Sequence, residues 1–179
     1  PKHIIYLKPL VDKNILNIFK YGITSFELEK ILSYEDIKNV SAYASNLRSQ
    51  KGQIYNKRYN TYFLGGNYSE GRKINVSSKN PFLKIALNPS ILMIVNSYLN
   101  KKCNLVDIQF AESFPSNDSE RKKSQRWHRD PAINNLIKVF VYFSDVNKDN
   151  GPFEFISGTH NKNIRDARYG PESKKRFGG

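Results

Sequence analysis

The spacing of hydrophobic positions along the chain changes near residue 103. Before that point apolar residues recur at the spacing of one helix face, and after it they alternate with polar residues, as in a half-buried strand. Ser33 is expected to begin a helix, and so is Pro89, whose missing N–H costs little at an early helical position. The pattern predicts helices over residues 12–20, 35–48 and 89–99, and strands and loops over residues 52–79.

The second half of the chain predicts strands over residues 104–112, 136–144 and 153–157, with a turn at Asn150-Gly151 between the last two. In the first of these, Val106, Ile108 and Phe110 would share one face, opposite Asp107 and Gln109. Strand, Asn-Gly turn and strand are typical of one side of an antiparallel barrel or jelly roll. We therefore expect a mainly β fold with N-terminal helices, in which helix 89–99 covers the sheet.

A candidate metal site precedes the second predicted strand, in the segment Gln125-Arg126-Trp127-His128-Arg129-Asp130. Alternate side chains of an extended backbone point to the same side, so His128 and Asp130 can reach one ion. An imidazole and a carboxylate are two of the three ligands of the facial triad in non-haem Fe(II) oxygenases. The pair alone also fits a surface turn. Trp127 before it, and Pro131 with the strand-like run after it, favour the metal interpretation.

With these features the sequence resembles the phytanoyl-CoA dioxygenase family of Fe(II)- and 2-oxoglutarate-dependent oxygenases. The resemblance rests on QRWHRD (125–130), IKVFVYFSDV (137–146) and DNGPFEFISGTH (149–160), where Ser157 replaces the usual proline. It implies a double-stranded β-helix of the jelly-roll or cupin type. It also implies an enzyme that uses Fe(II), 2-oxoglutarate and O2 to hydroxylate a small molecule, with His128 and Asp130 as catalytic metal ligands.

Four further residues are candidates for binding cosubstrate or substrate. Gln109 could contact the cosubstrate from its strand face, although such a face is more often simply solvated. Trp127, Phe140 and Tyr142 are expected to form an aromatic wall, in which Phe140 and Tyr142 share a strand face.

The resemblance also implies a third iron ligand and an arginine that pairs with 2-oxoglutarate, both on late strands. His160 follows Asp130 closely, so we expect it to lie at a turn after Gly158 and not to bind the iron. Both missing residues are then expected beyond Gly179, which would leave the jelly roll incomplete within this chain. Arg165 and Arg168 lie in a polar segment and are weak candidates for the arginine.

Composition sets the remaining expectations. The 179 residues (20.7 kDa) suit a single oxygenase domain, with a helical or mixed part over 1–103 and the first jelly-roll strands over 104–179. The chain has one cysteine, Cys103, no long apolar run and no apolar leader, so we expect a reducing, cytoplasmic setting without a membrane partner. Neither the substrate nor the oligomeric state follows from the sequence.

The net charge of +13 raises the possibility of a nucleic-acid partner. AT-rich coding explains the scattered lysines as well, and we do not expect such a partner. A local cluster beside the metal pair favours an anionic substrate, although a solvated loop would look the same; it holds Arg121, Lys122, Lys123, Arg126 and Arg129. The alternative to an enzyme is a non-catalytic jelly-roll binding protein or a basic nucleic-acid-binding domain. The presence of both residues of the metal pair argues for chemistry.

Overall fold

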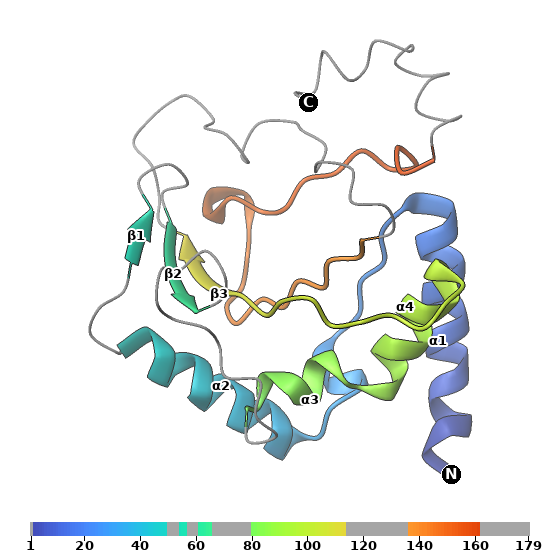
Figure 1. Ribbon diagram of the computed structural model, residues 1–179, viewed down its shortest axis with the longest axis horizontal. Helices are drawn as coiled ribbons and strands as arrows, with labels where there is room; N and C mark the ends of the chain where they lie inside the picture. Colours follow the sequence, from blue (N-terminus) through green and yellow to red (C-terminus); the bar gives the residue numbers. More distant parts are fainter. Residues whose placement is uncertain (1, 50–53, 57–60, 66–79, 114–135, 162–179) are drawn as a thin grey trace.

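The computed structural model describes residues 2–49, 54–56, 61–65, 80–113 and 136–161 (Figure 1). Its helices and strands, in chain order, are α1 (Lys2–Tyr21), the 3-10 turn η1 (Leu28–Lys30), α2 (Tyr34–Ser49), β1 (Ile54–Asn56), β2 (Thr61–Gly65), α3 (Phe82–Ala86), α4 (Pro89–Leu99), β3 (Phe110–Ser113) and the 3-10 turn η3 (Lys148–Asn150).

The prediction of a mainly β fold is wrong. The four α-helices among the described residues contain 20, 16, 5 and 11 residues, whereas the three strands contain only 3, 5 and 4. Of the predicted strand 104–112, only the end from Phe110 onward is a strand, and neither 136–144 nor 153–157 is one. A strand needs a neighbour that pairs its backbone N–H and C=O groups, and these segments have no ladder partner within the described part of the chain.

The predicted helices are confirmed, although α4 packs mainly against α1 and does not cover the sheet as expected. The ends of the helices show why the sequence specifies them. The Oγ of Ser33 accepts a hydrogen bond from the Asp36 N–H at 3.1 Å, which caps the start of α2. Asn88 caps α4 in the same way through the N–H of Ser90 at 2.9 Å, and Pro89 occupies the first turn. The left-handed conformation of Asn100, with φ of 50°, ends α4.

The hydrophobic core lies where α2, α3 and α4 meet. The buried residues come from all three helices: Val40, Ala44, Leu47, Phe82, Ile85 and Ile91. Phe82 is the centre of an aromatic cluster, with ring centroids 5.1 Å from Tyr43, 5.7 Å from Phe110 and 6.0 Å from Phe143. The core therefore connects the helices to β3 and to the segment that contains Phe143.

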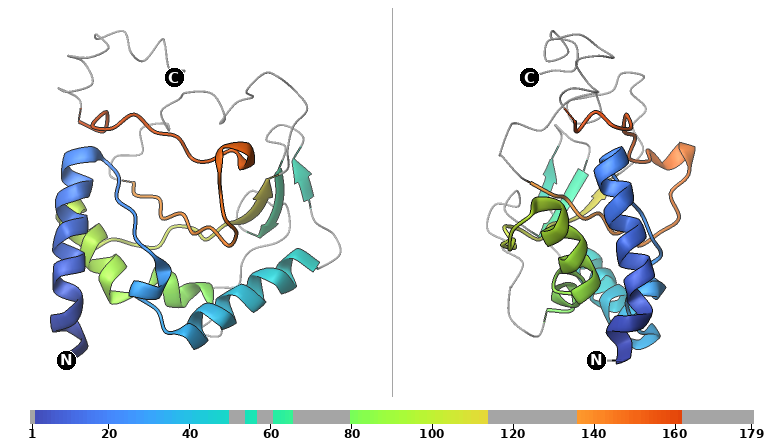
Figure 2. Two further views of the ribbon diagram at one scale, coloured as in Figure 1. Left: turned by 180° about the vertical axis from the view of Figure 1, so that it is seen from behind. Right: turned by 90° about the vertical axis from the view of Figure 1, so that its right-hand side faces the viewer.

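The three strands form one antiparallel sheet in the order β1-β2-β3. The pairing of β2 with β3 is irregular between Phe63 and Gly65, where the register shifts. Helices α2 and α3 lie together below the sheet in Figure 1, and α1 and α4 pack side by side at the other end, as the two views of Figure 2 also show. An ion pair between Arg48 and Glu112 joins the end of α2 to β3.

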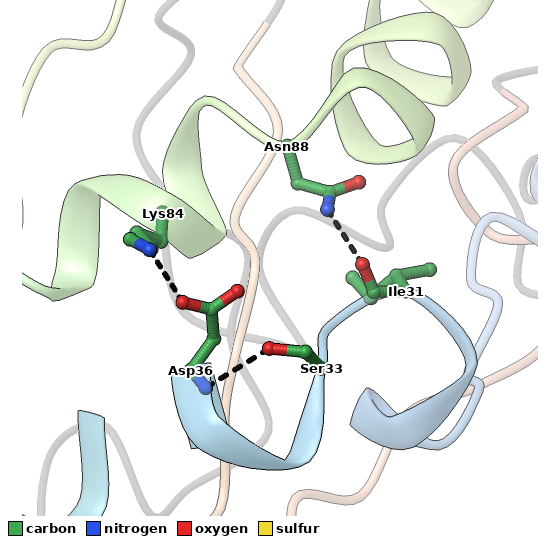
Figure 3. A network of polar contacts seen from close by, with 5 residues as sticks. All are labelled: Ile31, Ser33, Asp36, Lys84 and Asn88. Atoms are coloured by element: carbon green, nitrogen blue, oxygen red, sulfur yellow. Dashed lines mark hydrogen bonds and ion pairs between the residues drawn. The ribbon is translucent and has the colours of Figure 1, made fainter. Parts of the chain in front are cut away.

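A polar network fixes the start of α2 against the junction of α3 and α4 (Figure 3). Lys84 forms an ion pair with Asp36, and the Nδ2 of Asn88 donates a hydrogen bond to the carbonyl of Ile31 at 2.9 Å. The pKa of Asp36 is lowered, mainly because Lys84 donates a hydrogen bond to the carboxylate and secondly because of its contact with Ser33. The pKa of Lys84 is raised by the same ion pair.

Candidate functional site

The predicted metal pair lies outside the described residues. Trp127, His128 and Asp130 all fall within residues 114–135. Among the described residues there is no group of three or more His, Cys, Asp or Glu side chains that could hold a metal ion. The predicted residues whose surroundings are described are Gln109, Phe140, Tyr142 and His160.

Phe140 and Tyr142 come together with a third aromatic residue, Phe153, to form what we call the aromatic face. The rings of Phe140 and Phe153 stack with their centroids 5.1 Å apart and their planes at 30°. The backbone N–H of Phe153 donates a long hydrogen bond of 3.4 Å to the Tyr142 hydroxyl. All three side chains are exposed, by 57%, 56% and 53% for Phe140, Tyr142 and Phe153. Sequence analysis placed Phe153 in a strand but missed its part in this cluster.

The shared face predicted for Phe140 and Tyr142 is present even though the strand is not. Val141 packs against the core, and the ring of Phe143 lies 5.8 Å from that of Phe110. Phe140 and Tyr142, which alternate with them, are exposed. Alternate side chains of this segment therefore point to opposite sides around residues 140–143. The alternation is incomplete, because Phe143 is still 40% exposed and Val139, on the same side as Val141, is 53% exposed.

The predicted Asn150-Gly151 turn is confirmed, and it returns the chain so that Phe153 meets Phe140. The turn contains a short 3-10 segment, η3, which is capped by hydrogen bonds of both the side chain and the backbone of Asn147. The Oδ1 of Asn147 accepts from the Asp149 N–H at 2.9 Å, and its own N–H donates to the Oδ1 of Asn150 at 3.1 Å. Gly151 follows with φ of 67°, a conformation that favours glycine.

Gln109 is exposed and lies just before β3. Its Nε2 donates a hydrogen bond of 2.8 Å to Oδ2 of Asp107, so the two polar side chains share a face as the alternation predicted. On the opposite face Ile108 and Phe110 pack against the core, but Val106 is 78% exposed. The alternation thus describes the end of this segment and fails at its beginning.

His160 lies in the turn of residues 157–160, as predicted. Its Nε2 is 3.0 Å from the carbonyl oxygen of Phe19 in α1. The hydroxyl of Thr159 donates a hydrogen bond to the carbonyl of Ile156 at 2.8 Å, which closes the turn.

A surface hollow of about 370 Å³ lies between α1 and the segment before this turn. One cation, an amide and several hydroxyl groups line it beside apolar side chains: Lys13, Asn17, Tyr21, Ile23, Thr24, Ser25, Phe155 and Ser157. None of these was predicted as a site residue. Local periodicity gives no sign of such a hollow, because its two walls come from opposite ends of the described chain.

The family comparison matches most of the chain. A family model described as Phytanoyl-CoA dioxygenase (PhyH) matches residues 56–177, a range that contains QRWHRD, the aromatic face and His160. Comparisons with curated proteins and with solved structures gave no match. No helix in the described ranges is both long and apolar enough to cross a membrane.

Proposed function

We propose that this chain, which belongs to the phytanoyl-CoA dioxygenase family, is an Fe(II)- and 2-oxoglutarate-dependent dioxygenase that hydroxylates a small molecule. The family implies oxygenase chemistry of this kind in general. The observation that carries the proposal is that one continuous match, residues 56–177, includes both the His128/Asp130 pair and the aromatic face.

His128 and Asp130 would hold the iron. A neutral imidazole and a carboxylate are a donor set that suits Fe(II), and an extended segment would present them to the same side. The bound iron with 2-oxoglutarate would supply the oxidising chemistry. Overall, one oxygen atom of O2 enters a C–H bond of the substrate, the other enters succinate, and CO2 leaves.

The aromatic face would bind the apolar part of the substrate and exclude water from it. Phe140, Tyr142 and Phe153 offer adjacent exposed rings, and contiguous exposed apolar surface commonly marks a binding site. The Tyr142 hydroxyl adds one polar group that could orient a ligand. Trp127 and Gln109 are the further candidates for this role, for substrate and cosubstrate respectively.

We also propose that the substrate is anionic. Five basic residues lie within or close to the metal segment, namely Arg121, Lys122, Lys123, Arg126 and Arg129. A cluster of one sign raises the local concentration of an oppositely charged substrate, and salt screens the effect. Reversing two of these charges, R126E with R129E, should raise KM for an anionic substrate and reduce the dependence of kcat/KM on salt.

The test of the proposed function uses the whole protein that carries this chain. The variants H128A and D130A should lose iron binding and succinate formation from 2-oxoglutarate while their circular dichroism spectra stay unchanged. His3, which lies before the family match, provides the matched control, because H3A should retain both properties. Iron-independent ligand binding that survives H128A would instead support the non-catalytic binding protein.

A further inference from the structure

The turn that contains His160 is attached to the C-terminal end of α1. The N–H of Gly158 donates a hydrogen bond of 2.9 Å to the carbonyl of Tyr21, and His160 Nε2 lies 3.0 Å from the carbonyl of Phe19. The last carbonyl groups of a helix have no partner within the helix. Two of them in α1 are therefore satisfied by a segment far away in sequence, and Figures 1 and 2 show that segment reaching the end of α1 opposite the N-terminus.

Gly22 makes the close approach of the His160 ring possible. A Cβ at this position would lie 2.7 Å from Cγ and 3.0 Å from Cβ of His160, and closer still to Nδ1. Gly22 also has φ of 80°, which disfavours any residue with a side chain. The ring lies beside Tyr98 of α4 as well, with centroids 6.4 Å apart.

This arrangement occupies the Nε2 nitrogen of the imidazole. A carbonyl oxygen only accepts hydrogen bonds, so Nε2 must carry the hydrogen and has no lone pair for a metal. Gly22 lies against the ring beside Nδ1 and Cγ so closely that even a methyl group does not fit there. Nε2 of His160 is therefore not free to ligate iron while the turn stays on α1.

From these contacts we propose that His160 is a positioning residue, which with Gly22 and Gly158 latches the turn 157–160 onto α1. Helix α1 lies before the family match of 56–177, whereas His160 lies inside it. The latch makes the N-terminal helix an integral part of the family domain. It also fixes the chain a few residues after Phe153, so α1 helps to hold the aromatic face in place. That last step depends on the proposed function; the latch itself does not.

A double-mutant cycle tests the latch without any activity measurement. G22A adds both backbone strain and a clash with His160, whereas H160A removes the partner in that clash. Gly151 provides the matched control, since it too has a positive φ, of 67°, but no atom lies within 4 Å of where its Cβ would be. G151A should lower Tm by about 2–4 °C through strain alone, and G22A should lower it by at least twice that amount.

Adding H160A to G22A should remove the part of the Tm loss that comes from the clash with His160. The double variant should then have a higher Tm than the sum of the two single losses predicts. H160A should not change the loss of Tm that G151A causes. Additive losses for Gly22 and His160 would overturn the latch. If G22A is too unstable to purify, recovery of folded protein in the G22A/H160A variant supports the latch and failure to recover it contradicts it.

Metal binding separates a positioning role from a ligand role. H160A and H160Q should bind Fe(II), measured anaerobically by calorimetry, with the same stoichiometry as wild type, whereas H128A should not. In H160A the amide of Gly158 should exchange with solvent at least tenfold faster, and the glutamine of H160Q should restore part of the protection by donating to Phe19. Loss of iron in H160A would refute the latch and leave the oxygenase proposal standing. Absence of iron binding in wild type would refute the oxygenase proposal, while the cycle would still decide on the latch.

Discussion

Replacing Phe82 with alanine should be among the most destabilising changes in this protein. Phe82 is only 6% exposed, and its ring contacts three other aromatic rings, from α2, β3 and the 136–143 segment. Removing a buried phenylalanine typically costs about 3–5 kcal/mol from lost burial and the remaining cavity. Each aromatic pair adds roughly 0.5–1.5 kcal/mol, so F82A should fall near the upper end of that range.

The assay is urea denaturation, followed by the fluorescence of the single tryptophan, Trp127. With a typical slope of about 2 kcal/mol per molar urea, a loss of about 4 kcal/mol moves the midpoint by roughly 2 M. F140A is the matched control, because it deletes the same side chain at a position that is 57% exposed and should cost about 1 kcal/mol. Equal losses for the two variants would refute the placement of the core at Phe82.

Three other predictions concern the polar network and the aromatic face. The pKa of Asp36 is lowered in the folded protein, so its ion pair with Lys84 stabilises the fold at any pH above the unfolded-state pKa of about 3.9. This stabilisation is lost as the pH falls through the lower folded-state pKa of Asp36. The difference in urea midpoint between wild type and D36N should accordingly shrink below about pH 4, and a constant difference would contradict the assignment. N88A should cost about 2–4 kcal/mol in chemical denaturation, since it removes a helix cap and leaves the carbonyl of Ile31 unpaired, whereas N88S should keep the cap and cost about half as much. F140A should raise KM for the substrate several-fold while lowering Tm by only about 2–4 °C, and an unchanged KM would remove the aromatic face from the site.

Helix positions were predictable because the sequence contains both the apolar spacing of each helix and the residues that begin it. Ser33 before α2, and Asn88-Pro89 at the start of α4, supply hydrogen bonds and backbone geometry within a few residues of the helix. The turn at Asn150-Gly151 was predictable for the same reason, because its capping contacts all lie between residues 147 and 151. In each case the interactions that decide the structure are local.

The predicted sheet of residues 104–112, 136–144 and 153–157 does not form as expected. Alternation of apolar and polar residues indicates which way side chains point, but it does not indicate which backbone segment will pair with the strand. In the segment after residue 136 the shared face of Phe140 and Tyr142 was predicted correctly; both are exposed, whereas Val141 packs against the core. The hydrogen-bonded neighbour that would make the segment a strand is absent from the described residues. Composition alone cannot supply that neighbour, because pairing is a property of two segments.

The candidate site shows the same division between local and distant interactions. The sequence was sufficient to choose Phe140 and Tyr142, because alternation places the two rings on one face, and the structure shows both exposed. It was not sufficient to find that Phe153 completes the cluster, which depends on how the η3 turn returns the chain. The contact of His160 with Phe19 is the extreme case: nothing near either residue predicts it, yet Gly22 has room for the ring only because it lacks a side chain. The need for glycine at position 22 is therefore clear only from the folded chain. A substitution there should displace the turn that contains His160, near the other end of the described chain.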